Sequence, residues 1–156
     1  MTNKEASNLQ ESRISKYLGW NKVVASGARN FHPGDIESED WLGECKTHTK
    51  VSNKVIFHKD IWDKICSEAQ SKMKYPILFV DNGSQLLTDT YCMVPSTVFS
   101  YLDLSNDQLH FNGNTLSIDI SLDTNAGVCS QNKVIATILP LYTFKHELLI
   151  QKGFSV

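Results

Sequence analysis

A short run of apolar residues, Ile77–Val80, constrains the fold of this 156-residue chain more than any other feature. Four consecutive apolar residues after Pro76 leave no polar face, as expected of a strand that is buried on both sides of a sheet. A helix is predicted just before this strand, because Ile61, Ile65 and Ala69 recur at the spacing of one helix face. A buried strand next to an amphipathic helix indicates the α/β class.

The first half of the chain alternates between predicted helices and predicted strands. The expected elements are a helix over 6–18 that stops at Gly19, strands over 21–26, 35–38, 41–47 and 55–57, and a helix over 61–73 with Asp60 as its N-cap. A tight polar turn near Glu39–Asp40 joins two of the strands into a hairpin. This order predicts a central mixed sheet flanked by helices.

The chain beyond residue 81 is predicted to be richer in strands. The expected elements are strands over 91–94, 108–111, 115–120 and 134–139, a short helix from Ser96 to Leu102, and a terminal helix over 141–152. Asn112-Gly113-Asn114 predicts a hairpin between two of these strands. We expect one domain over residues 1–156, with a core at about 6–81 and an elaboration at about 82–156.

Composition excludes two classes of protein. No apolar stretch approaches the roughly 20 residues that span a bilayer, and Met1–Gln10 lacks the apolar core of a signal peptide, so we expect an intracellular protein with no membrane partner. The four cysteines are widely spaced and include no Cys-x-x-Cys pair, which argues against a zinc site or a disulfide framework. Buried free thiols are the better expectation.

The distribution of charge is more informative than the net charge of −2. Residues 1–75 carry 12 Lys and Arg against 10 Asp and Glu, whereas residues 76–156 carry 3 against 7. A phosphate-binding surface is therefore expected on the first half of the chain. Acidic metal ligands would also lower the net charge of a nuclease, so charge alone does not decide the function.

Three charged residues of the predicted hairpin form the clearest chemical pattern. Glu44 and Lys46 are two apart in a strand and so share a face, while Cys45 points to the other face. Asp35 begins the neighbouring strand, where its carboxylate can meet that of Glu44. Two adjacent carboxylates suit a hard divalent cation such as Mg²⁺, and Lys46 beside it can orient or deprotonate a water and stabilise charge on a phosphate. These parts together suit hydrolysis of a phosphodiester bond.

The segment that carries this pattern is His32-Pro33-Gly34-Asp35, then eight intervening residues, then Glu44-Cys45-Lys46. It resembles the P-D-x(n)-E-x-K signature of the PDDEXK, or restriction-endonuclease-like, nucleases. With Ser26-Gly27-Ala28 ahead of it and Thr47 after it, it looks most like Holliday junction resolvases and related phage-type endonucleases. The resemblance covers about residues 9–81 and departs from the signature at Gly34, where the signature has proline.

The resemblance implies a fold, a cofactor and a partner. The expected fold has the shared core of helix, strand hairpin, helix and strand. The expected cofactor is Mg²⁺ or Mn²⁺ bound by Asp35 and Glu44, with the Cys45 carbonyl as a further candidate ligand. That family often adds a glutamate from the first helix, and Glu11, 24 residues before Asp35, is the matching candidate, with Glu5 a weaker rival. The implied partner is DNA, branched DNA in particular, and the implied assembly is a homodimer that acts in recombination.

Candidate DNA contacts lie on both sides of the motif. Ser26 and Arg29 precede it, and the basic residues Lys50, Lys54 and Lys59 follow it. Each has a plainer interpretation as a solvated loop or surface residue. His32 and His48 flank the motif without enough partners for a histidine metal site, and the three tryptophans are expected in the core. Glu68 could approach the site, although an exposed helix position is the simpler expectation.

Two other interpretations of the same residues remain open. Asp35, Glu44 and Lys46 could form a surface ladder of ion pairs that contributes little to stability. The domain could also be a non-catalytic DNA- or protein-binding module that has kept a nuclease fold. Within the nuclease class, a restriction-type or repair-type enzyme that cuts duplex DNA is an alternative to a junction resolvase, because junction selectivity comes from shape and dimer geometry.

Overall fold

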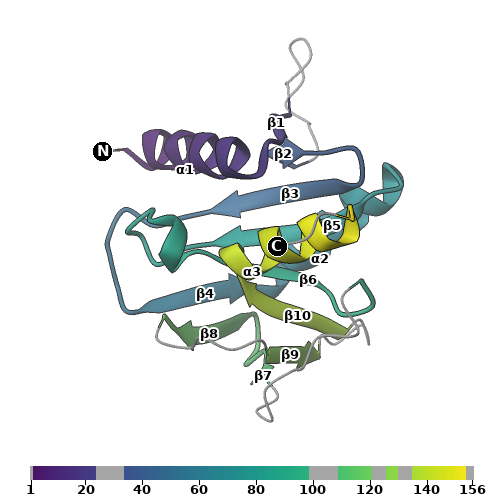
Figure 1. The fold of residues 1–156 in the computed structure, drawn as a ribbon. Coiled ribbons are helices and arrows are strands. Elements are labelled where there is room, and N and C mark those ends of the chain that lie inside the picture. Colours follow the sequence, from purple (N-terminus) through teal and green to yellow (C-terminus); the bar gives the residue numbers. More distant parts are fainter. Residues whose placement is uncertain (1, 24–33, 99–108, 121–125, 130–134, 154–156) are drawn as a thin grey trace.

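The chain forms an α/β structure in the computed structural model, which describes residues 2–23, 34–98, 109–120, 126–129 and 135–153 (Figure 1). The helices are α1 (Asn3–Leu18), α2 (Lys59–Ser71), α3 (Leu141–Gln151) and the 3-10 helix η1 (Leu87–Asp89). The strands are β1 (Asn21–Lys22), β2 (Ile36–Glu37), β3 (Trp41–Lys46), β4 (Lys54–His58), β5 (Tyr75–Val80), β6 (Tyr91–Pro95), β7 (Leu109–His110), β8 (Thr115–Asp119), β9 (Ala126–Cys129) and β10 (Ile135–Pro140).

Eight strands form one mixed sheet in the order β1-β2-β3-β5-β6-β10-β9-β7. Strands β3 and β5 are parallel and lie at its centre, whereas β5, β6 and β10 pair antiparallel. Strands β4 and β8 pair separately as a two-stranded sheet. The prediction of an α/β fold with a central mixed sheet is thus confirmed. The C-terminal region extends that same sheet, which the sequence did not predict.

Helix α1 begins at a capping box and ends at a left-handed glycine. The Thr2 hydroxyl accepts the Glu5 N–H at 3.1 Å, and a Glu5 carboxylate oxygen accepts the Thr2 N–H at 3.1 Å. Gly19 adopts φ 73°, which ends the helix where the sequence predicted. The helix begins three residues before the predicted start because of the cap. Glu5 therefore serves as a capping residue of α1.

The predicted hairpin is present as β2 and β3, paired antiparallel with Ile36 opposite Gly43. Its turn is fixed by the Ser38 hydroxyl, which accepts the Trp41 N–H at 3.1 Å. Strand β1 adds to its outer edge but spans only two residues. The remainder of the strand predicted over 21–26, beyond Val23, lies outside the described residues.

The prediction that Asp60 caps the second helix is wrong. Helix α2 starts at Lys59, directly after β4, and its N-cap is His58 without a side-chain hydrogen bond. Asp60 lies inside the first turn, where its N–H donates to the Asn114 side-chain oxygen and its carboxylate accepts the Asn114 side-chain N–H, both at 3.0 Å. The strand runs into the helix without a loop, so the aspartate ties the helix start to the turn before β8.

The prediction that the strands at 108–111 and 115–120 pair with each other in a hairpin is also wrong. The chain does turn at Gly113, with Asn112 bridged to Thr115. However, β8 pairs with β4 and β7 pairs with β9. Leu116 and Ile118 are buried against the apolar side chains of β4, and this burial outweighs the local preference for pairing across the turn. From Ser96 a turn is seen, and the rest of the helix predicted there lies outside the described residues.

The central sheet separates two apolar layers. One layer joins α2, β4 and β8 to the face of the sheet that carries Leu42 and Leu78, with Trp62 fully buried in it. The other joins α1 and α3 to the face that carries Cys45 and Phe79, and Trp20 and Trp41 pack there against Phe144. Figure 1 shows α3 crossing one face of the sheet. All three tryptophans thus belong to the core, as predicted.

The expectation of free, buried thiols has a counterpart in the structure. Cys45, Cys66 and Cys92 carry free thiols, of which Cys45 and Cys92 are buried, while the Cys129 side chain lies outside the described part. Among the described helices, none has both the length and the apolar character needed to cross a membrane.

Candidate functional site

The β2–β3 hairpin places Asp35 directly beside the strand that carries Glu44 and Lys46. Asp35 immediately precedes β2, and its N–H donates to the Gly43 carbonyl at 2.8 Å. Its Oδ2 accepts the Cys45 N–H at 2.8 Å. The backbone and the side chain of Asp35 are therefore both fixed against β3, between Gly43 and Cys45.

Glu44 and Lys46 share one face of β3, as predicted from their spacing. The Lys46 ammonium Nζ lies 3.5 Å from the Glu44 carboxylate Oε1. The Glu44 side chain is 12% exposed and that of Lys46 is 46% exposed. Both side chains lie on the same face of β3 as Leu42, which packs in the layer with α2. The Cys45 side chain lies on the other face, in the layer beneath α1 and α3. A partly buried carboxylate is thus paired with a cation that reaches solvent.

The electrostatic environment of Glu44 disfavours its charged form. Burial raises the pKa of Glu44 above its ordinary value, and the neighbouring Asp35 carboxylate raises it further. Lys46 and Lys64 oppose this rise without cancelling it. A divalent cation between Asp35 and Glu44 would reverse the balance, because it would favour both ionised carboxylates.

Glu11, on α1, acts on the charge of Cys45, whose side chain lies in the layer beneath that helix. Burial raises the pKa of the Cys45 thiol well above its ordinary value, and the charges of Asp35, Glu11 and Glu44 add to this rise in that order. Three carboxylates therefore act on one residue of β3. The Cys45 thiol stays protonated, which leaves the backbone carbonyl as the candidate ligand of this residue. In an extended strand that carbonyl points to the same side as the Cys45 N–H, toward Asp35.

The described residues contain a carboxylate pair but no complete ligand cluster. No group of three or more His, Cys, Asp or Glu side chains in the described ranges is arranged to hold a metal ion. Mg²⁺ commonly keeps several waters and binds through only one or two carboxylates, so the pair of Asp35 and Glu44 fits such an ion. Glu11 lies near enough to Cys45 to act on its thiol and is half-buried on α1.

The end of β3 lies in a buried polar group that the sequence did not predict. Gln10 is 2% exposed, and its Nε2 donates to the Lys46 carbonyl at 2.6 Å and to Asp81 Oδ2 at 3.5 Å. Asp81, which follows β5, also accepts the Thr47 hydroxyl at 2.6 Å. These bonds join α1 to the ends of β3 and β5 beside Lys46. The available signal was the spacing of Gln10 with Ala6 and Ile14, which puts a polar residue on the buried face of α1.

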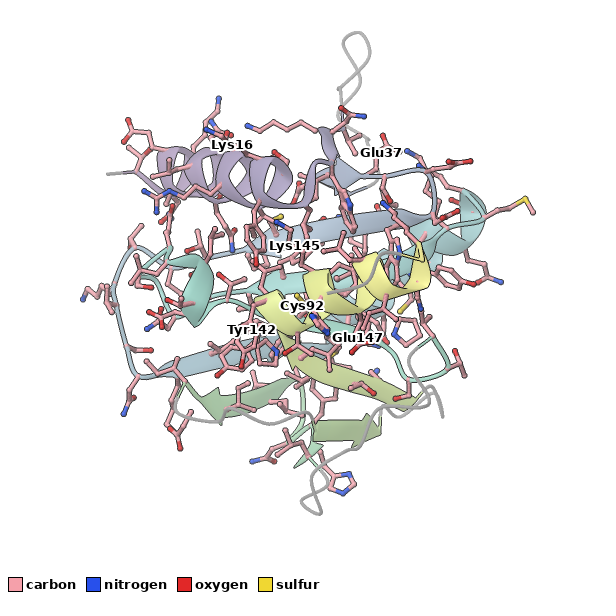
Figure 2. The ribbon with its side chains drawn as sticks, in the orientation of Figure 1. Lys16, Glu37, Cys92, Tyr142, Lys145 and Glu147 are labelled. Carbon is pink, nitrogen blue, oxygen red and sulfur yellow. The ribbon has the colours of Figure 1, made fainter. Side chains whose placement is uncertain are left out.

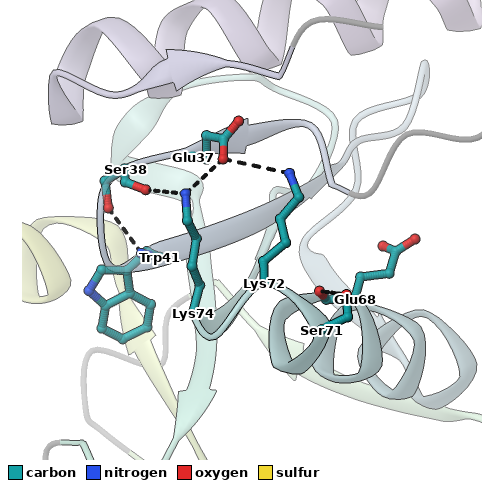
Figure 3. Close-up of polar contacts among 7 residues, drawn as sticks. All are labelled: Glu37, Ser38, Trp41, Glu68, Ser71, Lys72 and Lys74. Carbon is teal, nitrogen blue, oxygen red and sulfur yellow. Dashed lines mark hydrogen bonds and ion pairs between the residues drawn. The ribbon is translucent and has the colours of Figure 1, made fainter. Parts of the chain in front are cut away.

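The hairpin is tied to the end of α2 by a second polar group (Figure 3). Lys74 Nζ lies 2.7 Å from Glu37 Oε1 and also donates to the Ser38 carbonyl at 2.7 Å. Lys72 Nζ lies 3.7 Å from the same Glu37 oxygen. The hydrogen bond from Lys74 is the main reason that the pKa of Glu37 is lowered. These contacts hold β2, and with it Asp35, in position relative to α2.

Gly34 stands where the PDDEXK signature has proline, and its backbone conformation accounts for the difference. Its φ is +71°, which proline cannot adopt because its ring fixes φ near −65°. A Cβ at this position would also lie 2.7 Å from the Leu42 side chain. Glycine is therefore required at this position, immediately before Asp35, for the backbone to turn into β2.

The expectation that Glu68 occupies an exposed helix position is wrong. Its side chain is 8% exposed because it lies on the face of α2 that packs on the sheet. Lys64 Nζ is 3.8 Å from its Oε2, and neither carboxylate oxygen has a hydrogen-bond partner within the described part of the chain. Lys64 also acts on the charge of Glu44. Glu68 is thus linked to the candidate site through one shared lysine.

The residues predicted to contact DNA differ in their surroundings: some lie outside the described residues, some are exposed, and some are paired with carboxylates. Ser26 and Arg29, like His32, lie outside the described residues. Lys50 and His48 are exposed after β3. Lys54 lies 3.3 Å from the Asp119 carboxylate and Lys59 2.5 Å from that of Asp63, so both are paired within the fold. A role for Lys54 or Lys59 at a phosphate would require exchange of these partners.

Comparison of the chain with protein-family models, with curated proteins and with solved structures gave no match in any of the three. The functional assignment therefore depends on the residues and geometry described above.

The raised pKa of Glu44 predicts that Glu44→Gln stabilises the metal-free protein at neutral pH. The folded state holds the Glu44 proton to a higher pH than the unfolded state does, so stability falls as pH rises from about 4.5 through the raised pKa. Glutamine removes this loss. Urea unfolding in EDTA should show the variant more stable than the parent at pH 8 and nearly equal to it at pH 4. Glu39→Gln, on the exposed turn, is the matched control, and a variant less stable than the parent at pH 8 would contradict the account.

Proposed function

We propose that this protein is a metal-dependent DNA endonuclease with a restriction-endonuclease-like core. The observation that carries the proposal is the approach of Asp35, Glu44 and Lys46 on one hairpin, with the carboxylates close enough to raise the pKa of Glu44 and the ammonium 3.5 Å from it. An acidic pair beside a solvent-reaching lysine suits hydrolysis of a phosphodiester bond.

Each residue has a separate task in this proposal. Asp35 and Glu44 hold Mg²⁺ or Mn²⁺, with the Cys45 carbonyl and Glu11 as further candidates. A bound ion at these residues would supply Lewis-acid polarisation of the phosphodiester and a more acidic water. Lys46 orients the attacking water and places its charge where negative charge develops on the phosphate. Gln10 holds the Lys46 carbonyl and thereby fixes the end of the strand.

The order of elements around the hairpin supports the proposed core. Helix α1 is followed by the β1–β2–β3 sheet edge, then by α2, and then by β5 parallel to β3. This is the order of helix, strand hairpin, helix and strand that the resemblance implies. Strand β4, inserted before α2, and the strands from β6 onward are additions to that order.

A non-catalytic DNA- or protein-binding module with the same fold is the second candidate. The two functions differ in what they need at the hairpin. A binding module needs no carboxylate pair, whose mutual repulsion contributes to the rise of the Glu44 pKa. A hydrolase needs this pair and Lys46 as well. The presence of an unfavourable pair next to a solvent-reaching lysine favours the hydrolase.

Labelled duplex and four-way junction DNA, incubated with the protein with and without Mg²⁺, test the proposal. We expect Mg²⁺-dependent cleavage that is faster on the junction, by a homodimer whose two-fold symmetry supplies two sites. Faster cleavage of duplex would instead indicate a restriction-type or repair-type enzyme. Binding of DNA without cleavage in Mg²⁺ or Mn²⁺ would favour the non-catalytic module.

Light scattering on the protein and on its complex with junction DNA tests the proposed homodimer. A strict monomer in both samples would contradict that part of the proposal.

A further inference from the structure

A cationic pocket lies on the opposite face of the sheet from Glu44 and Lys46. It has a volume of about 710 Å³ between α1, the η1 segment and α3. Arg13, Lys16 and Lys145 contribute three cations, and Tyr17, Leu86 and Leu87 contribute apolar surface. No residue that lines it carries a carboxylate among those the structure describes. In a chain with a net charge of −2, three cations around one hollow indicate an anionic ligand.

The fold holds two of the three cations of the pocket in place. The Lys145 ammonium lies over the Tyr17 ring, 4.0 Å from its centroid, which fixes the lysine from α3 beside α1. Arg13 donates from its guanidinium to the Gln85 carbonyl at 2.9 Å. Figure 2 labels Lys16 on α1 and Lys145 on α3, the two helices that flank the pocket. The positive charges therefore come from two helices that the core holds together.

The loop that forms the third side of the pocket is strained. Gln85 has φ +60°, a left-handed conformation that a residue with a side chain rarely adopts. Its buried side chain donates to the Ala6 carbonyl at 2.9 Å, and its own carbonyl accepts Arg13. The next residue, Leu86, is 55% exposed at the pocket. Strain of this kind persists where surrounding contacts over-determine it and is frequent at ligand sites.

We propose that this pocket binds a nucleoside phosphate. Three cations suit a phosphate dianion better than a single carboxylate, and arginine matches phosphate geometry with paired donors. The apolar surface of Tyr17, Leu86 and Leu87 suits a flat base better than a sugar covered with hydroxyls. The pocket volume lies within the range of about 300–1,000 Å³ typical of small-molecule sites. The phosphate can belong to a free nucleotide or to the end of a DNA strand.

Titration of the 156-residue chain with deoxyadenosine monophosphate, followed by amide NMR shifts, tests this inference. Shifts should concentrate at α1, η1 and α3. The double variant Lys16→Ala/Lys145→Ala should raise Kd for the nucleotide by roughly 10-fold or more, because it loses two charge-assisted contacts. Lys4→Ala with Lys22→Ala removes the same charge from exposed sites outside the pocket and should leave Kd nearly unchanged.

Further ligands separate the parts of the proposal. Deoxyadenosine without phosphate and inorganic phosphate without a base should each bind more weakly than the nucleotide. A single-stranded oligonucleotide with a 5′-phosphate that shifts the α1, η1 and α3 amides at lower concentration than the free nucleotide does would identify a strand end as the source of the phosphate, and the reverse order would identify the free nucleotide. Absence of shifts at millimolar nucleotide, equal binding of deoxyadenosine, or binding of decanoate in preference to the nucleotide would overturn the proposal. None of these outcomes depends on whether the protein cleaves DNA.

Discussion

Replacing Lys46 by alanine should lower the cleavage rate by about 10² to 10³ while folding, metal binding and most DNA binding persist. The ammonium of Lys46 lies 3.5 Å from Glu44 and reaches solvent, so it can meet a phosphate held at the carboxylate pair. Its charge acts mainly where negative charge develops during the reaction, and its loss should therefore reduce kcat more than it raises KM. Single-turnover cleavage assays on junction and duplex DNA measure this effect.

The controls separate catalysis from general charge. Lys4→Ala removes an exposed lysine at the start of α1 and should change the rate only slightly, in a salt-dependent manner. Lys46→Met keeps the aliphatic stem and should be as inactive as Lys46→Ala if the ammonium is what matters. Near-native turnover of both Lys46 variants on both substrates would remove the central residue from the proposed mechanism.

Asp35→Asn should weaken Mn²⁺ binding by roughly 10- to 100-fold or more, because even supporting residues of metal sites commonly have effects of this size. The amide keeps the size of the side chain but loses the charge that faces Glu44. Its oxygen can still accept the Cys45 N–H, which Asp35 Oδ2 accepts at 2.8 Å, so the hairpin should remain folded. Calorimetric titration with Mn²⁺ measures the difference.

The matched control for this variant is Asp40→Asn, on the exposed turn of the same hairpin. It should bind Mn²⁺ as the parent does, and circular dichroism should show all three proteins folded. Equal Mn²⁺ affinity of the parent and the Asp35→Asn variant would place any metal site elsewhere.

The elements of the first half could be predicted because their signals are local. The apolar run Ile77–Val80 forms the last four residues of β5, Gly19 ends α1, and the turn near Glu39–Asp40 forms the hairpin that brings Asp35 to Glu44. The position of these residues on adjacent strands follows from a two-residue side-chain period and a short turn, both of which are visible in the sequence.

The errors arose where distant contacts decide the structure. The turn at Gly113 predicted a hairpin, but β8 pairs with β4, more than fifty residues earlier in the chain, where Leu116 and Ile118 are buried. Likewise, Asp60 resembled a helix cap but bonds to Asn114. Such pairings depend on the burial of apolar side chains in the assembled fold, which no local window contains.

The candidate site shows the same division. The sequence indicated Asp35, Glu44 and Lys46, and the structure brings them together. It did not indicate the buried bonds of Gln10 and Asp81 beside Lys46, since a polar residue on a buried helix face acquires its partner only when the fold is complete.

Anomalous diffraction from crystals of the protein grown in Mn²⁺ is the most direct test of the proposed metal centre. The account predicts a peak with Asp35 and Glu44 oxygens at about 2.0 to 2.3 Å, the range of hard divalent cations with oxygen ligands. It also predicts that the Lys46 ammonium lies beside this ion, because it already lies 3.5 Å from Glu44. At saturating Mn²⁺, a hairpin with no peak between these two carboxylates, or a peak held by other residues alone, would contradict the account.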